Sequence, residues 1–113
     1  MARADDKTSA AMLQIHRADE IAILMLNNPP VNASSAALRV ALYDGIEKCA
    51  KDPSIAALIL MGHDKNFMAG ADIREFDGPL LDPQMPAIIA AIENCGKAVI
   101  AAIQGAALGA GFE

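Results

Sequence analysis

The 113-residue chain is 54% hydrophobic by residue count, which suits one folded domain or part of one and is too apolar for a disordered chain. Its formal net charge is -5 and its Lys and Arg residues form no basic cluster, so we exclude a protein that binds the phosphate backbone of nucleic acids. Only 4% of the residues are aromatic, so the core must be built from small side chains that pack closely.

The N-terminal half predicts a strand pair followed by a helix. Two apolar runs, residues 12–16 and 21–26, are joined by the polar sequence RADE, which indicates antiparallel strands. Both faces of the second run are apolar, and we expect both to be covered. The prolines of NNPPVNASS end this strand, and Asn32 or Ser34 can cap a helix that ends before Asp52. The apolar positions at helical spacing are Leu38, Leu42, Ile46 and Cys49.

The C-terminal half predicts two more buried strands, separated by a loop and a second helix. The sequence IAALILMG is typical of a buried strand, HDKN of a turn, and MAGADIREFDG of a loop or short helical stretch. A connection with three prolines leads to a helix that Gly96 can end in a left-handed cap. The prolines are Pro79, Pro83 and Pro86, and the helix carries Ile88, Ile89 and Ile92. KAVIAAIQG then predicts another buried strand and AALGAGFE the start of one more helix, an order that indicates an α/β layered domain.

Neither cysteine indicates a metal site. Cys49 and Cys95 are far apart, with no CxxC spacing and no His close by, so we interpret both as buried helix thiols in a reducing cytosol. The N-terminus contains acidic residues and lacks the apolar stretch of a secretory signal. The longest charge-free tract, residues 98–112, is shorter than the roughly 20 residues that cross a bilayer. We therefore predict a soluble, cytoplasmic protein that binds no metal and no membrane.

Two segments share one pattern, in which glycine and alanine follow a predicted strand at the point where the chain turns. In FMAGADIREF, Gly70 permits close approach and leaves the N–H of Ala71 free to point at a bound group. In GAALGAGFE, three glycines precede a helix whose first N–H groups have no internal partner. Two such donors converging on one oxygen would form an oxyanion hole, with Glu113 beside it as a proton-transfer group.

Two other interpretations of these segments stay open. Glycine and alanine at such turns commonly serve only to pack a helix tightly against its neighbour, and the helix dipole favours an acidic residue in a first turn anyway. A dinucleotide site is the second, although GAALGAG reads G-x-x-x-G-x-G and such sites read G-x-G-x-x-G. We expect Asp72, Arg74 and Glu75 to be partly solvated and to pair with one another.

At these residues the sequence resembles a known family. NFMAGADIREF and KAVIAAIQGAALGAGFE resemble the two signature blocks of the crotonase family, the enoyl-CoA hydratases and isomerases, and NNPPVNA is similar to its substrate-entry segment. The resemblance runs from about Met12 to Glu113. AGADIREF is especially similar to the hydratase module of multifunctional fatty-acid oxidation proteins. The resemblance implies an α/β, crotonase-like (ClpP/crotonase) spiral of ββα units, of which residues 1–113 would be the N-terminal part of a single domain.

The resemblance also implies the site. The N–H groups of Ala71 and Ala110 would hold the thioester oxygen, and Glu113 would be the first of two catalytic glutamates. Lys65 or Arg74 would lie near the phosphates of coenzyme A, which is part of the substrate, so no separate cofactor is implied. The residues implied to bind the CoA thioester are Val31, Ala69, Gly70, Ala71, Asp72, Ile73, Arg74 and Gly109.

The sequence departs from the family pattern in two places. Alanine stands at position 110, where the family usually has glycine, so the N–H is kept and a methyl group is added. The family's second glutamate, in a G-x-P-E segment, would lie beyond Glu113, and we expect residues 1–113 alone to be inactive.

The resemblance therefore implies a parent protein that adds water in the syn sense to trans-2-enoyl-CoA thioesters in fatty-acid degradation. A double-bond isomerase on the same fold and a non-catalytic CoA-binding fragment are the alternatives. Because family members are usually trimers or pairs of trimers, a homotrimer or dimer of trimers is implied. We then expect exposed apolar surface over AIIAAI and KAVIAAI.

Overall fold

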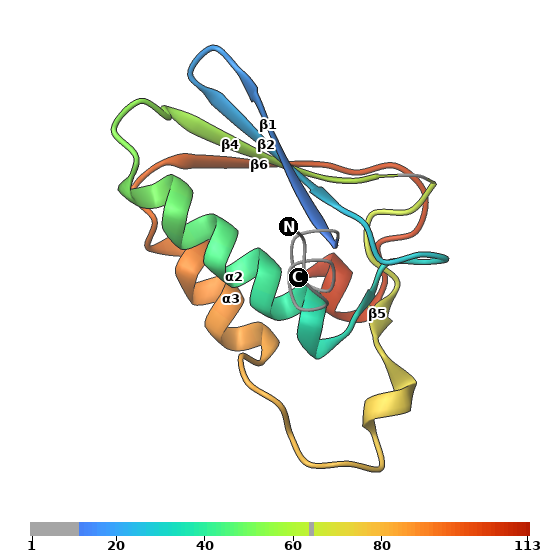
Figure 1. Ribbon diagram of the computed structural model, residues 1–113. Coiled ribbons are helices and arrows are strands. Elements are labelled where there is room, and N and C mark those ends of the chain that lie inside the picture. The colour runs from blue at the N-terminus through green and yellow to red at the C-terminus, as the bar shows by residue number, and fades with distance from the viewer. Residues whose placement is uncertain (1–11, 64) are drawn as a thin grey trace, which may run out of the picture.

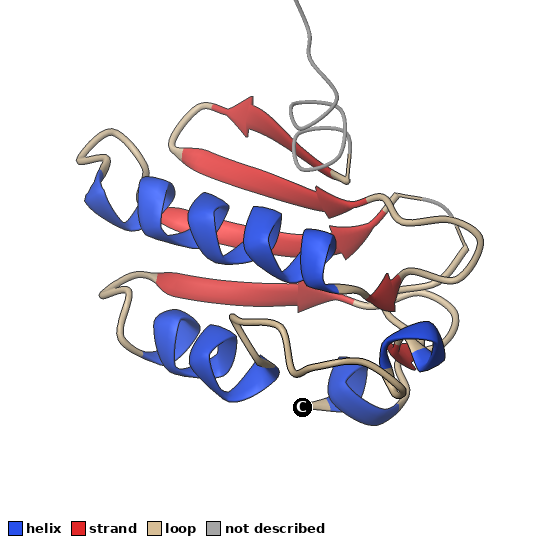
Figure 2. Ribbon diagram, turned by 60° about the horizontal axis from the view of Figure 1, so that its bottom comes forward, coloured by secondary structure: helices blue, strands red, loops and turns tan. Residues whose placement is uncertain are grey.

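The main layer is one mixed sheet with two helices on a single face. The computed structural model describes residues 12–63 and 65–113. Its larger sheet has four strands in the order β1-β2-β4-β6, and α2 and α3 lie side by side against it (Figure 1). In Figure 2 the longer helix, α2, crosses in front of the strands, and α3 lies beside the edge strand β6. The elements of this layer are β1 (Leu13–Ala18), β2 (Ile21–Leu26), α2 (Ala36–Lys51), β4 (Ala57–Gly62), α3 (Met85–Glu93) and β6 (Ala98–Ala102).

The strand pairing follows from the lengths of the connections. β1 and β2 form the predicted antiparallel hairpin, with Leu13 opposite Leu26, and Asp19 makes the tight turn with a φ of 55°. β2 and β4 are parallel, as are β4 and β6. Parallel neighbours need a long crossover, and α2 and then the segment containing α3 supply these two crossovers. The predicted α/β order is confirmed.

The core lies between the sheet and α2. Alternate side chains of β2 and β4 face the helices and are buried, and the predicted apolar stripe of α2 packs against them. A Cβ atom at Gly45 would lie 2.6 Å from Cδ2 of Leu13, so this glycine lets β1 approach α2 closely. The buried residues of these three elements and of α3 include Ala22, Leu24, Leu26, Leu38, Leu42, Ile46, Cys49, Leu58, Leu60 and Ile88.

The opposite face of the sheet is more open than the sequence predicted. The alternate residues Ile21, Ile23 and Met25 of β2 are only half-buried, so the expectation that both faces are covered is wrong for the described residues. β6 is mostly exposed and not buried, with 54% of Ile100 accessible, because it lies at the edge of the sheet. The predicted exposure of KAVIAAI is thus confirmed, whereas AIIAAI is partly covered, since Ile88 is fully buried against the core.

Helix α2 begins and ends close to the predicted positions but uses a different cap. The Ser35 hydroxyl accepts a hydrogen bond from the N–H of Leu38 at 3.2 Å, so Ser35 is the N-cap, and neither Asn32 nor Ser34. Asp52 follows the last turn as C-cap. Lys97 donates to the carbonyl oxygen of Cys49 at 2.7 Å, which satisfies one of the last carbonyls of the helix.

Helix α3 is shifted relative to its prediction. Pro86 lies in its first turn and not in the connection, a position where the missing N–H of proline costs nothing. Its C-cap is Asn94, and Gly96, with a φ of 79°, lies two residues further on. Cys95 is therefore a half-buried turn residue and not a buried helix thiol.

A small second sheet and two short helical turns lie beyond the carboxyl ends of the parallel strands (Figure 1). The predicted helix at AALGAGFE is a single 3-10 turn. None of the helices in the described part of the chain is long and apolar enough to cross a membrane. These remaining elements are β3 (Ala33–Ser34), β5 (Gly70–Ala71), η1 (Ile73–Glu75) and η2 (Gly109–Phe112).

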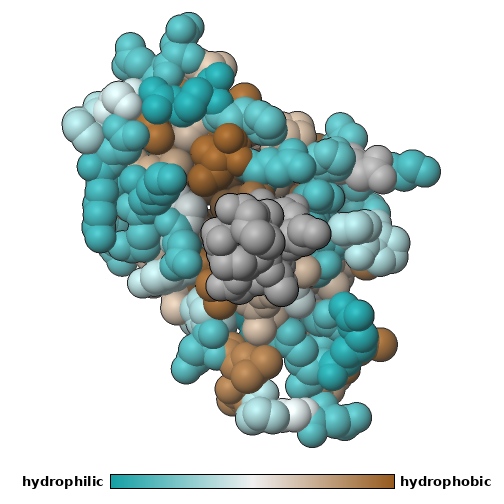
Figure 3. Space-filling view, viewed as in Figure 1, coloured by the Kyte–Doolittle hydropathy of each residue, from teal (hydrophilic) through white to brown (hydrophobic). Residues whose placement is uncertain are grey.

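The surface is polar over most of the face seen in Figure 3. Apolar side chains appear toward its lower end, where Figure 1 places the segment between η1 and α3. The exposed large apolar residues of this segment are Phe76, Leu80 and Leu81, and Ile73 of the adjoining η1 is exposed as well.

Candidate functional site

The turn after β4, residues 65–75, is bonded to the segment before α2. β5 pairs in parallel with β3, and Gly70 has a φ of 110°, a value that favours glycine. The Asp72 side chain is buried and accepts from the backbone N–H of Arg74 at 3.0 Å, which caps η1. Arg74 Nη2 also donates to Asp72 Oδ2 at 2.6 Å, and these hydrogen bonds from Arg74 hold the pKa of the Asp72 carboxyl below its usual value. The predicted pairing of Asp72 with Arg74 is confirmed.

Glu75 pairs with a different arginine from the one predicted. Its Oε2 accepts from the N–H of Ala36 at 2.7 Å, at the start of α2, and its Oε1 lies 3.3 Å from Nη2 of Arg39. The buried Arg39 guanidinium also donates to the carbonyl oxygens of Leu81 at 2.9 Å and Pro83 at 2.6 Å. One arginine on α2 therefore fixes both ends of the segment between η1 and α3.

The turn after β6, residues 103–113, packs against the first turn. Phe67 and Met68 donate their N–H groups to the carbonyl oxygen of Ala106 at 3.0 and 3.1 Å. In return, the N–H of Leu108 donates to the carbonyl oxygen of Met68 at 3.0 Å. A Cβ atom at Gly111 would lie 2.3 Å from the Met68 carbonyl oxygen. Only glycine fits at position 111, so this glycine serves tight packing, as one of the interpretations of the sequence predicted.

Gly70 and Gly109 bring the two turns into direct contact. A Cβ atom at Gly109 would lie 3.6 Å from the Cα of Gly70, and one at Gly70 would lie 3.3 Å from the carbonyl oxygen of Leu108. Both glycines have positive φ, 110° at Gly70 and 53° at Gly109. Ala71 and Ala110, the two predicted N–H donors, each follow one of these glycines directly. The sequence pattern thus brings the two predicted donor segments together in space.

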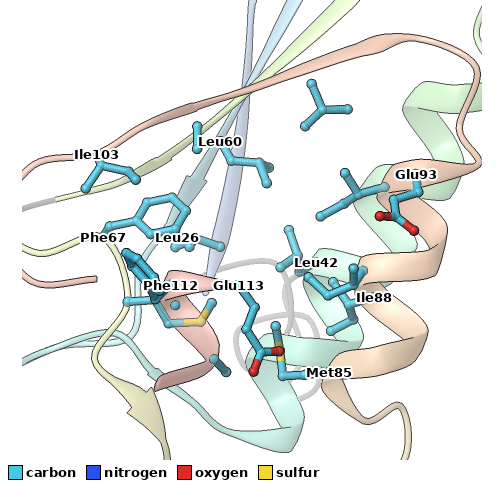
Figure 4. A pocket seen from close by; sticks show the side chains of 17 residues that line it. Leu26, Leu42, Leu60, Phe67, Met85, Ile88, Glu93, Ile103, Phe112 and Glu113 are labelled. Carbon is cyan, nitrogen blue, oxygen red and sulfur yellow. The ribbon is translucent and has the colours of Figure 1, made fainter. Parts of the chain in front are cut away.

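A cavity of about 300 Å³ lies between the second turn, α3 and the edge of the sheet (Figure 4). Ala110 and Glu113, two of the predicted site residues, are among the residues that line it. Its other walls come from Leu26, Leu42, Leu60 and the apolar face of α3. Glu93 on α3 is the second carboxylate among its lining residues, and no feature of the sequence had indicated it. The cavity is therefore an apolar space with carboxylates at its border.

Ala71 and Asp72 line a different, smaller cavity of about 100 Å³, together with Arg39 and Glu75. The structure places Ala71 and Ala110 on adjoining turns without joining them in one cavity. The remaining predicted substrate-binding residues line neither cavity: Val31, Ala69, Gly70, Ile73, Arg74 and Gly109.

The predicted phosphate contacts lie at the surface. Both Lys65 and Arg74 are exposed, and Ile73, predicted to bind CoA through its backbone, is 74% exposed. Across residues 12–63 and 65–113, His, Cys, Asp and Glu side chains form no group of three or more that could hold a metal ion.

Comparison with known proteins gives a consistent result. The sequence profile described as "Enoyl-CoA hydratase/isomerase" matches residues 16–113. The peroxisomal bifunctional enzyme of Danio rerio is 47% identical over 93 residues, which cover 82% of this chain and 13% of the relative. A probable enoyl-CoA hydratase of Bacillus subtilis (strain 168) is 38% identical over 100 residues, covering 82% of this chain and 39% of the relative.

The fold is also similar to solved structures. The crystal structure of an enoyl-CoA hydratase/carnithine racemase from Magnetospirillum magneticum superposes with a TM-score of 0.79 at 33% identity. The match covers 88% of this chain and 41% of the solved one. The chain thus spans less than half the length of each of these three similar proteins.

Proposed function

Because the chain belongs to the enoyl-CoA hydratase/isomerase family and has its α/β crotonase fold, we propose that it carries half of the catalytic centre of an enoyl-CoA hydratase. The full-length protein would add water to a trans-2-enoyl-CoA thioester. The observation that carries this proposal is the contact of Gly70 with Gly109, which sets the segments of Ala71 and Ala110 side by side.

The backbone donors would stabilise charge on the thioester. When the oxygen of water bonds to C3 of the substrate, the C2–C3 double bond opens and negative charge moves to the thioester oxygen. N–H groups of Ala71 and Ala110 aimed at that oxygen would stabilise the resulting enolate. A proton delivered to C2 then completes the addition. Backbone donors suit this role because adjacent turns hold them in fixed positions before the reaction begins.

Glu113 would handle the proton of the attacking water. Its carboxylate borders the apolar cavity of about 300 Å³ that Ala110 also lines. A carboxylate in that position can accept the proton that water loses as its oxygen bonds to C3. The family's second glutamate would supply the proton for C2. The apolar wall formed by α3 would receive the acyl chain, whose methylene groups gain free energy on leaving water.

Coenzyme A would lie along the first turn. The backbone of Ala69 to Ile73 would bind its adenine and pantetheine parts, and the exposed cations of Lys65 and Arg74 would lie near its phosphates. Arg74 is held by Asp72 at 2.6 Å, which orients its guanidinium before any substrate arrives. A trimer or a pair of trimers is proposed for the assembled protein on the family resemblance.

A double-bond isomerase is the second candidate, because the matching family includes both activities. Isomerisation of a 3-enoyl-CoA moves a proton from C2 to C4 through a dienolate that also places negative charge on the thioester oxygen, so the two N–H donors would serve both reactions. A non-catalytic CoA-binding protein is the third, and it would need the cavity and the first turn but not Glu113.

The test uses the full-length protein with 2-enoyl-CoA and 3-enoyl-CoA substrates. We expect hydration of the 2-enoyl thioester, and we expect Glu113→Gln to lower kcat by about 10²-fold or more while CoA-thioester affinity changes little. A protein that converts only the 3-enoyl substrate is an isomerase. One that binds the thioesters and converts neither is a binding protein, and the hydratase proposal fails.

A further inference from the structure

Asn32 occupies a left-handed backbone conformation in the loop between β2 and α2. Its φ is 58°, a value that costs most side chains free energy and that Asn tolerates better than most. It is only 6% exposed although its side chain is polar. A buried amide in an uncommon conformation persists only where its hydrogen bonds repay both costs.

Every polar group of Asn32 has a partner. Its backbone N–H donates to the carbonyl oxygen of Asn28 at 2.7 Å, and its side-chain Oδ1 accepts from the N–H of Asn28 at 2.7 Å. Its Nδ2 donates to the carbonyl oxygens of Asn66 at 2.9 Å and of Phe67 at 3.2 Å. Its own carbonyl oxygen accepts from Ala69 at 3.4 Å. Asn32 therefore joins the loop before α2 to three residues of the first turn.

Two of these residues, Asn66 and Phe67, continue the connection to the second turn. Asn66 Oδ1 accepts from the N–H of Ala106 at 3.0 Å, and the N–H of Phe67 donates to the Ala106 carbonyl oxygen at 3.0 Å. The carbonyl groups that Asn32 holds thus belong to residues that hold Ala106. A one-residue change at position 32 reaches both turns.

The packing leaves little freedom for another arrangement. A Cβ atom at Gly62 would lie 1.9 Å from the Asn66 carbonyl oxygen and 3.1 Å from Asn32 Nδ2. A Cβ atom at Gly105 would lie 1.8 Å from the Lys65 carbonyl oxygen. Gly62 at the end of β4 and Gly105 after β6 therefore pack closely around the residues that Asn32 bonds.

We propose that Asn32 is a positioning residue, whose side-chain amide sets the spacing between the turns that carry the N–H groups of Ala71 and Ala110. The inference rests on the proposed function, since it assigns these N–H groups to the thioester oxygen. Asn32 touches no substrate itself. It acts through Asn66 and Phe67, whose carbonyl groups it orients.

Two substitutions in the full-length protein separate this role from general stability. Asn32→Asp keeps the size, the acceptor for Asn28 and the tolerance of positive φ, but it turns a carboxylate oxygen toward the carbonyl oxygens of Asn66 and Phe67. Asn32→Gly keeps the backbone conformation and removes the side chain. Asn94→Asp introduces the same chemical change at an exposed turn and is the matched control.

We expect both Asn32 variants to lower kcat by about 10- to 100-fold, the range that a displacement of about 1 Å produces, with Asp the more severe. Affinity for a CoA thioester should change by less than about 3-fold, because the first turn's own backbone would still bind it. Amide hydrogen exchange at Ala106 and Leu108 should become faster. Asn94→Asp should leave kcat and exchange unchanged.

The hydrogen-exchange measurement keeps the two proposals distinguishable. If the wild-type protein hydrates no enoyl-CoA, the proposed function fails, and faster exchange at Ala106 in the variants still supports the connection through Asn32. If folded Asn32→Gly keeps wild-type kcat and wild-type exchange in the second turn, Asn32 positions nothing and the inference is wrong. The Gly variant decides this even if the charge in Asn32→Asp prevents folding.

Discussion

The turns after β4 and β6 begin from the same kind of sequence and are held by different means. The first is fixed by side chains of the segment before and within α2, chiefly Asn32, which bonds Asn66 and Phe67, and Arg39, which pairs with Glu75. The second is held through its own backbone, which bonds the backbone and the Asn66 side chain of the first, and its side chains Leu108 and Phe112 are 59% and 84% exposed. The difference shows that the position of the second turn depends on the first. A substitution that displaces either turn should therefore displace the second.

The largest expected loss of stability comes from the close backbone contact between Gly105 and Lys65, which positions the second turn. Gly105→Ala would place a Cβ atom 1.8 Å from the Lys65 carbonyl oxygen at a residue with a φ of 72°. Steric overlap and left-handed strain together should lower the free energy of unfolding by about 3 kcal/mol or more. Urea unfolding of the full-length protein measures this.

Gly96→Ala is the matched control for that measurement. Gly96 has a similar φ of 79°, but a Cβ atom there meets nothing within 4 Å. Its substitution should cost only the strain of the left-handed conformation, about 1 kcal/mol. Equal losses at both positions would mean that the contact with Lys65 does not hold the second turn.

The next effect concerns catalysis at the second turn. Ala110→Pro deletes the backbone donor at the start of η2, where proline is tolerated, and should lower kcat by about 10²-fold while the protein stays folded. Ala110→Gly keeps the donor and should retain activity. Hydration rates measured beside circular dichroism decide the matter, and a folded Pro variant with wild-type kcat would show that Ala110 is no oxyanion donor.

A smaller loss is expected where the first turn is anchored. Arg39→Leu removes the donors to the Leu81 and Pro83 carbonyls and the partner of Glu75, which is 26% exposed and so regains some hydration. We expect a loss of about 2 kcal/mol in the free energy of unfolding. Arg17→Leu at an exposed 3.9 Å pair should change stability little. An Arg39 variant as stable as wild type would show that this side chain does not hold the first turn in place.

The smallest effect is a pH dependence within the first turn. Hydrogen bonds from Arg74 lower the pKa of Asp72 from its ordinary value of 3.8. The stabilisation is therefore present above that pH and is lost as the pH falls through the lower pKa of the folded state. In Arg74→Gln the acid limb of the stability curve should move to higher pH. Coincident wild-type and variant curves from pH 2 to 7 would contradict this.

The sequence predicted the helices and the sheet strands better than their burial. Leu38, Leu42 and Ile46 recur at helical spacing, so α2 could be recognised from its apolar stripe alone. Burial depends on what covers an element, and nothing in KAVIAAI indicates that β6 lies at a sheet edge. The N-cap of α2 was misplaced, because NASS offers three residues able to cap a helix within four positions and the prediction chose Asn32 or Ser34 in place of Ser35.

The glycines of the candidate site could be predicted from the sequence, but the side chains that hold its turns in place could not. Glycine marks turns directly, so Gly70 and Gly109 indicated where two segments approach. Arg39 gave no such signal, because its partners Leu81 and Pro83 lie 42 and 44 residues further along the chain. Asn32 could be read only as a cap, since its bonds reach 34 and 35 residues away. The residues assigned to catalysis and the cytoplasmic location stay predictions.

The glycines at positions 62, 105 and 111 impose a rule on how related sequences can diverge. Carbonyl oxygens of Asn66, Lys65 and Met68 lie within 2.3 Å of where their Cβ atoms would be, so any side chain there displaces main chain. Glycine kept at these three positions in related sequences would therefore indicate that the fold is the same, and would say nothing about the activity. Position 110 obeys no such restriction, because its N–H survives most replacements. If Ala110 holds the thioester oxygen as proposed, variation there would record adaptation to different acyl groups.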